Sequence, residues 1–192
     1  MMATRLFLLR HGETEWTLSG QHTGRTDIPL TEYGCDQARR VRDELKGQSF
    51  VKVLTSPLSR ALDTCRLAGL GDQVETVDDL LEWNYGDYEG VTTDEIRKKR
   101  PRWSLWLDGA PGGETAADVG ARVDRVIKEV RQIDGEVAIC AHGHGLRVLA
   151  ARWVGLPPSD GRLFALEPAS LSILGYERET PVVQRWNAPA GL

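Results

Sequence analysis

The chain has 192 residues, which is enough for one domain with a substantial core, so we expect a single domain over residues 1–192. Its hydrophobic fraction of 41% and charged fraction of 27% are those of an ordinary globular protein. The net charge of −4 argues against nucleic acid or an anionic membrane as a partner, because both attract basic proteins. Any anion site must therefore be a local cluster of arginines.

The cysteines and the N-terminus indicate the compartment. Cys35, Cys65 and Cys140 are odd in number, share no metal-binding spacing and fall on predicted helices or strands, so we expect buried free thiols. The first apolar run has only four residues, too few for a signal peptide, and no segment approaches the length of a membrane span. These features predict a cytoplasmic protein.

Apolar runs alternate with helical patterns along the chain. The predicted strands are 5–9, 50–54, 74–77, 137–141, 170–176 and 181–186. The predicted helices are 31–46, one that Ser56-Pro57 opens and that ends near Gly69, 115–133, and one carrying Leu146 to Trp153. Residues 84–114 read as an irregular, lid-like segment over an edge of the sheet. This order predicts an α/β fold with a mostly parallel central sheet, covered by helices on both faces.

Two of the predicted strands end in the same way, on glycines and a histidine. The strand 5–9 runs into Arg10-His11-Gly12, and the strand 137–141 runs into His142-Gly143-His144-Gly145. Ligands of parallel α/β sheets bind at the carboxyl ends of the strands. Two facing imidazoles with an arginine beside one of them suit phosphoryl transfer.

His11 is the candidate nucleophile, because a neutral imidazole can take a phosphoryl group and release it to water. Arg10 and Arg60 are candidate phosphate clamps, since guanidinium groups match phosphoryl oxygens. Arg60 falls in the first turn of its predicted helix, where an anion is also favoured. Taken alone, His11 could simply end a strand and Arg60 could be a solvated helix residue.

His142 could donate a hydrogen bond to the transferring phosphoryl group. The pair His142-x-His144 also suggests a metal, but the further ligands that a metal needs are missing nearby, so we expect none. His144 could equally line the rim of the site or be structural. Glu82 is a candidate general acid, because a carboxyl group sheltered by aromatic neighbours holds its proton more tightly. Composition leaves three rivals open: Asp87, Glu89 and Glu114.

Together these motifs resemble the histidine phosphatase superfamily, in its phosphoglycerate mutase-like branch. The resemblance rests on residues 9–16, 23–24, 30–31, 56–61, 82–86 and 141–144. It implies a three-layer α/β/α sandwich with the site at the carboxyl ends of the strands, Glu82 as the proton donor, and neither a metal nor another cofactor.

The chain also departs from the mutases of that branch. Those enzymes are longer in the region of 92–113, carry a longer C-terminal tail and usually have asparagine in place of His144. The loops 19–24 and 85–90 look most like the small phosphatases of the branch, among them sedoheptulose-bisphosphatase and actinobacterial acid phosphatases. A more open site favours hydrolysis over transfer.

The sequence therefore predicts a metal-independent phosphomonoester phosphatase that acts on small phosphorylated sugars or sugar acids through a phosphohistidine. A cofactor-dependent phosphoglycerate mutase and a non-catalytic phospho-ligand binder are the alternatives. The oligomeric state, monomer or homodimer, stays open. The expected catalytic residues are Arg10, His11, Arg60, Glu82 and His142. The expected substrate-binding residues are Arg10, Thr17, Gln21, His22, Thr23, Gly24, Arg60, Glu82, Tyr85, Gly143 and His144, with Trp16, His22, Tyr85 and Trp103 as a stacking rim.

Overall fold

The computed structural model describes residues 4–71 and 74–189, and within them a six-stranded sheet forms the centre of the molecule. Its strands follow the order β3-β2-β4-β1-β5-β6. They are β1 Arg5–Arg10, β2 Phe50–Thr55, β3 Val74–Thr76, β4 Glu136–Ala141, β5 Leu171–Glu177 and β6 Thr180–Ala188. The first four strands pair in parallel, and β5 and β6 add antiparallel pairs. The mostly parallel sheet is thus confirmed.

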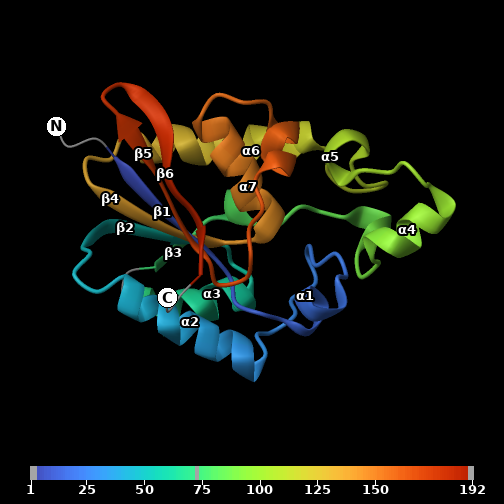
Figure 1. Ribbon diagram of the computed structural model, residues 1–192, viewed down its shortest axis with the longest axis horizontal. Coiled ribbons are helices and arrows are strands. Elements are labelled where there is room, and N and C mark those ends of the chain that lie inside the picture. Colours follow the sequence, from blue (N-terminus) through green and yellow to red (C-terminus); the bar gives the residue numbers. More distant parts are fainter. Residues whose placement is uncertain (1–3, 72–73, 190–192) are drawn as a thin grey trace.

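Helices cover both faces of the sheet. They are α1 Glu15–Ser19, α2 Glu32–Glu44, α3 Ser59–Cys65, α4 Thr93–Lys99, α5 Leu105–Asp108, α6 Ala116–Val130 and α7 Gly143–Trp153. In Figure 1, α2 and α3 lie on one side of the sheet and α6 and α7 on the other, while α1, α4 and α5 lie beyond the ends of the strands. The predicted three-layer α/β/α sandwich is confirmed.

The alternation of side chains along β1 explains the two layers of core. Leu6 and Leu8 pack into the cluster that includes α6 and α7, whereas Phe7 and Leu9 pack into the cluster on the α2 side. All four are buried, which is why the strand reads as a continuous apolar run.

The helix after β2 begins later than the sequence predicts. Ser56 does not cap it: Leu58 occupies the N-cap position, and α3 begins at Ser59. The Ser56 hydroxyl lies 2.7 Å from Nε2 of His142 instead, so a contact with a distant residue replaces the expected local cap. Beyond α3 the chain continues in a wider helical turn to Leu70, with Gly69 at a φ of 82°.

The segment 84–114 is not irregular throughout, as the sequence had suggested. Thr92 and Glu95 form a reciprocal capping box that begins α4, and α5 follows after a short turn. The short helix α1 was also not predicted, because five residues are too few to show a helical period.

Two further expectations concern thiols and membranes. Cys65 and Cys140 are buried and Cys35 is partly exposed, and all three are free. Within 4–71 and 74–189, no helix has both the length and the apolar character needed to cross a membrane.

Candidate active site

The two histidine-tipped strands lie side by side. The parallel register of β1 and β4 pairs Arg10 with Ala141, which places the next residue of each strand, His11 and His142, at the same edge. Their ring centroids are 5.2 Å apart, and both side chains are almost fully buried. The sequence prediction that two imidazoles meet at a strand edge is confirmed.

The hydrogen bonds of His11 define which of its nitrogens can react. Its Nδ1 lies 2.7 Å from the carbonyl oxygen of Gly12, so Nδ1 carries the proton and Nε2 keeps the lone pair. Burial, followed by the charges of Arg60 and Arg10, lowers the pKa of His11 well below 6.5. The ring is therefore neutral at physiological pH, which is the state that a nucleophile needs.

His142 is held in the opposite tautomer. Arg60 donates from Nε to His142 Nδ1 at 3.2 Å, so the proton of the neutral ring is on Nε2, 2.7 Å from the Ser56 hydroxyl. Burial is the main cause that lowers the pKa of His142 well below 6.5, and Arg60 adds to it. The ring can therefore donate a hydrogen bond from Nε2.

Arg60 itself is fully buried beside the site rather than in its wall. Its other guanidinium nitrogens donate to the carbonyl oxygens of Thr23, Gly24 and Thr26 at 2.9 to 3.3 Å. The structure thus brings Arg60 to His142 and to the loop 23–26, with four hydrogen bonds to protein acceptors.

Within the described part of the chain, one N–H donor of Arg10 has no hydrogen-bond partner. Of the buried side-chain nitrogen and oxygen atoms in the described part of the chain, Arg10 Nε is the one without a partner, although Nη1 donates to the carbonyl of Leu166. A Cβ on Gly143 would lie 3.2 Å from that Nε, so any larger residue there would crowd the guanidinium group. A buried, unpartnered guanidinium donor is suited to an anion.

Glu82 lines the same cavity as Arg10 and His11 and is 4% exposed. Its carboxylate accepts hydrogen bonds from the backbone N–H groups of Trp83, His144 and Gly145 at 2.8 to 3.0 Å. The bonds to the first turn of α7 fix the carboxylate at the N-terminus of that helix.

The rival carboxyl groups are placed elsewhere. Glu89 accepts from the backbone of Gly24 and Thr26, Glu114 pairs with Arg122, and Asp87 is exposed. None of the three lines the cavity that His11 and Glu82 share.

That cavity has a volume of roughly 240 Å³. Its lining comprises Arg10, His11, Trp16, Thr17, Gly20, Gln21, His22, Thr23, Glu82, Tyr85, Thr93, Gly143, His144, Arg147 and Leu166. Most predicted substrate-binding residues are among them, but Gly24 and Arg60 are not, and neither is His142, which was predicted as catalytic. Gly20, Thr93, Arg147 and Leu166 were not predicted as site residues. Only Arg147 had a usable signal, since it follows His144 by three residues on one helix.

One wall is aromatic and closely packed. The hydroxyl of Tyr85 lies 2.7 Å from Nδ1 of His144, and the Tyr85 ring packs against His22 at 4.8 Å. Trp103 contacts the His22 ring from behind and is itself only 3% exposed. The expectation that Trp103 forms part of the rim was therefore wrong; it supports a rim residue.

The two histidines of the sequence His142-x-His144 face different partners. His142 contacts Ser56 and Arg60, whereas His144 contacts Tyr85. In the residues that the structure describes, no three His, Cys, Asp or Glu side chains gather as a metal site.

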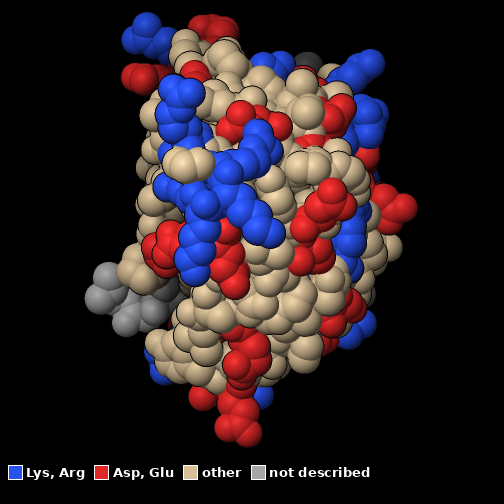
Figure 2. Space-filling view, turned by 90° about the vertical axis from the view of Figure 1, so that its right-hand side faces the viewer, with Lys and Arg blue, Asp and Glu red and all other residues tan. Residues whose placement is uncertain are grey.

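The surface charge near the site is locally positive, although the chain is acidic overall. Helix α4, whose first residue Thr93 lines the cavity, and the turn after it carry five exposed basic residues, Arg97, Lys98, Lys99, Arg100 and Arg102. Figure 2 views the end of the molecule that carries α4 and shows lysine and arginine side chains gathered in a patch. Such a patch raises the local concentration of anions.

The buried histidines predict how stability depends on pH. Burial lowers the pKa of His11, His142 and His144 well below 6.5, so these rings bind protons in the unfolded chain before they do so in the folded one. The free energy of unfolding should therefore fall as the pH drops below about 6.5. Urea denaturation at pH 7, 6 and 5 checks this, and a constant or rising stability over that range would contradict it.

The comparisons with known proteins agree with this site. The model of the histidine phosphatase superfamily, branch 1, matches residues 6–189. An acid phosphatase of Mycobacterium tuberculosis is 43% identical over 183 residues, 90% of this chain and 87% of the relative. The sedoheptulose 1,7-bisphosphatase of Saccharomyces cerevisiae is 38% identical over 188 residues, 81% of this chain and 69% of the relative.

A solved structure from Mycobacterium tuberculosis has the same fold, with a TM-score of 0.91 and 38% identity, covering 98% of this chain and 99% of that one. Other relatives carry the name phosphoglycerate mutase. The chain belongs to the histidine phosphatase superfamily, branch 1. The expected class, a phosphoric monoester hydrolase, is confirmed.

Proposed function

We propose that this protein hydrolyses small phosphorylated sugars or sugar acids through a phosphohistidine on His11. The observation that carries the proposal is the shared cavity: it is lined by His11, whose ring is neutral, by Arg10, whose buried Nε has no protein partner, and by Glu82. A nucleophile, an anion donor and a proton carrier are the groups that phosphomonoester hydrolysis requires.

In the first step, Nε2 of His11 attacks the phosphorus and the bond to the sugar oxygen breaks. Glu82, protonated at this stage, gives its proton to that oxygen, so a neutral alcohol leaves. Arg10 and the Nε2–H of His142 stabilise the charge on the phosphoryl oxygens; His142 must exchange its Ser56 contact for this role.

In the second step, water attacks the phosphohistidine and the N–P bond breaks. The Glu82 carboxylate takes a proton from that water, and inorganic phosphate leaves. His11 returns to its neutral form and Glu82 to its protonated form, so atoms and protons balance. No step needs a metal, because the arginines carry the positive charge.

Features of the cavity wall support the substrate class. One relative is named as a sugar bisphosphatase, and Trp16, His22 and Tyr85 contribute aromatic surface to a cavity wall that is otherwise largely polar, as a sugar phosphate requires. A further cation, Arg147, suits substrates with a second anionic group. Phosphoglycerate mutase is the second candidate, supported by the names of some relatives.

Release of phosphate and interconversion of 2- and 3-phosphoglycerate should be measured side by side on one preparation, in the presence of a chelator. We expect phosphate release from several sugar phosphates and negligible interconversion, even with 2,3-bisphosphoglycerate added. Mutase turnover well above phosphate release would favour the second candidate, and loss of activity that zinc or magnesium restores would contradict metal independence.

We also propose a cellular location and a partner for the protein. A cytoplasmic location is supported by the three free cysteines. The partner is a small phosphorylated metabolite, and a homodimer stays an open proposal.

A further inference from the structure

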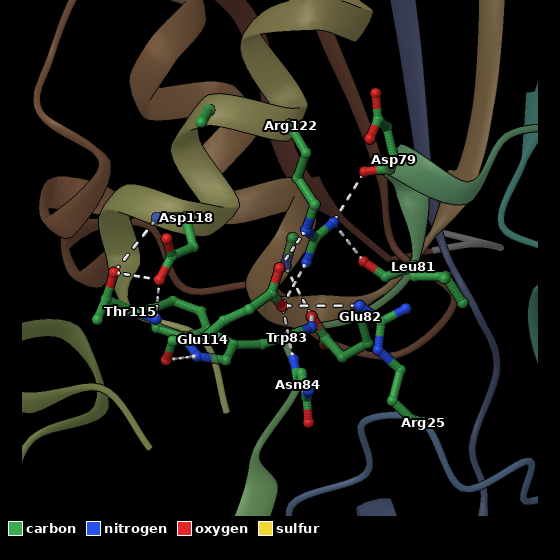
Figure 3. Close-up of polar contacts among 12 residues, drawn as sticks. Arg25, Asp79, Leu81, Glu82, Trp83, Asn84, Glu114, Thr115, Asp118 and Arg122 are labelled. Carbon is green, nitrogen blue, oxygen red and sulfur yellow. Dashed lines mark hydrogen bonds and ion pairs between the residues drawn. The ribbon is translucent and has the colours of Figure 1, made fainter. Parts of the chain in front are cut away.

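One ion pair, between the buried Arg122 and the partly buried Glu114, connects the segment of Glu82 to helix α6 (Figure 3). Arg122 of α6, 6% exposed, donates from Nε to Oε1 of Glu114 at 2.8 Å and from Nη2 to Oε2 at 3.2 Å. This two-pronged geometry fixes both side chains relative to each other.

Arg122 also holds the chain just before Glu82. Its Nη1 donates to the carbonyl oxygen of Asp79 at 2.8 Å and to that of Leu81 at 2.6 Å. Leu81 directly precedes Glu82, so one guanidinium group fixes the backbone on that side.

Glu114 holds the chain just after Glu82. Its Oε2 accepts from the backbone N–H of Asn84 at 2.7 Å, and its own backbone N–H donates to the carbonyl of Asn84 at 2.8 Å. The indole N–H of Trp83 donates to the backbone carbonyl of Glu114 at 2.8 Å. Both neighbours of Glu82 along the chain are therefore tied to this pair (Figure 3).

We propose that Arg122 and Glu114 are positioning residues for Glu82: they set the place from which its carboxyl group reaches the leaving oxygen. A buried ion pair adds little net stability over apolar packing of the same volume, so its directional bonds are what it contributes. Those bonds end on the backbone on either side of Glu82. The inference rests on the proposed role of Glu82 as the general acid.

The test compares two substrates. Glycerol 2-phosphate has a poor leaving group that needs a proton, whereas p-nitrophenyl phosphate barely needs one. Arg122→Lys keeps the charge but cannot bond two carbonyls and both carboxylate oxygens at once. A small displacement of a catalytic group costs on the order of ten- to a hundredfold, so we expect kcat/KM to fall by that factor for glycerol 2-phosphate and by less than about threefold for p-nitrophenyl phosphate.

A second variant and a double variant make the test specific. Glu114→Gln keeps an acceptor for Asn84 but loses the ion pair, so it should show the same selective loss. In a Glu82→Gln background, Arg122→Lys should cause no further selective loss, because the positioned group is already gone. If Arg122→Lys does not fold by circular dichroism, Glu114→Gln answers the same question.

Arg152→Lys is the matched control. Arg152 also makes a two-pronged pair, with Asp124 at 2.9 and 3.0 Å, but joins α7 to α6 without a hydrogen bond to residues 79–84. It should leave the ratio between the two substrates unchanged.

Equal losses on both substrates in Arg122→Lys and Glu114→Gln would overturn the positioning role, and so would a selective loss that persists in the Glu82→Gln background. If Glu82→Gln itself shows no selectivity, the acid role in the proposed function fails as well, which separates the two failures.

Discussion

Replacing His11 with alanine should abolish the covalent phosphoenzyme. His11 lines the cavity, and its Nδ1–H bond to the carbonyl oxygen of Gly12 leaves the Nε2 lone pair free for reaction. Loss of a nucleophile removes the whole two-step route, so turnover should fall on the order of 10⁴-fold or more.

Rapid quenching with ³²P-labelled substrate measures this directly. The label should survive base and be lost in acid, as expected of an N–P bond, and should be absent from the variant. His22→Gln is the control, since the Nδ1 of His22 is bonded to the carbonyl of Val91 in a similar way but the ring lies in the aromatic wall. It should still form phosphoenzyme. Label on a serine or an aspartate of the native protein would exclude the mechanism.

Glu82→Gln should damage the reaction most when the leaving group is poor. Glutamine keeps the size of the side chain and its one carbonyl oxygen can still accept one of the two N–H bonds from α7, but its amide has no acidic proton to give. General acid catalysis is worth roughly 10² to 10⁴, so kcat/KM for a sugar phosphate should fall by about that factor and for p-nitrophenyl phosphate far less.

The slope of log kcat/KM against the pKa of the leaving alcohol, over a series of aryl and alkyl phosphates, measures the effect. It should become steeper in Glu82→Gln. Asp87→Asn is the control, because Asp87 is exposed and outside the cavity. An unchanged slope in Glu82→Gln would exclude Glu82 as the acid.

Much of the architecture followed from local patterns. Parallel strands that are buried on both faces appear in the sequence as continuous apolar runs. Helix α6 is buried along one stripe, so its apolar residues recur with the helical period. The histidines after β1 and β4 could be placed together for the same reason: parallel strands end at one edge.

The short helices could not be predicted from such patterns. Helix α1 has five residues and α5 only four, so neither spans enough of a period to be recognised. Helix α4 has seven residues and buries only Ile96, so it shows no apolar period either. The late start of α3 has another cause, since the Ser56 hydroxyl is engaged by His142 from a different part of the chain.

The sequence by itself determined the sheet, its covering helices and the histidines at its edge, because each of these depends on residues near one another along the chain. Only the tertiary structure placed Glu82 and Arg147 in the wall of the cavity and Glu114 and Trp103 outside it, and left Arg10 Nε without a partner while Arg60 donates to several carbonyl oxygens. These outcomes depend on the directions of side chains from segments far apart in sequence, and such directions are set by packing and hydrogen bonding in the folded molecule.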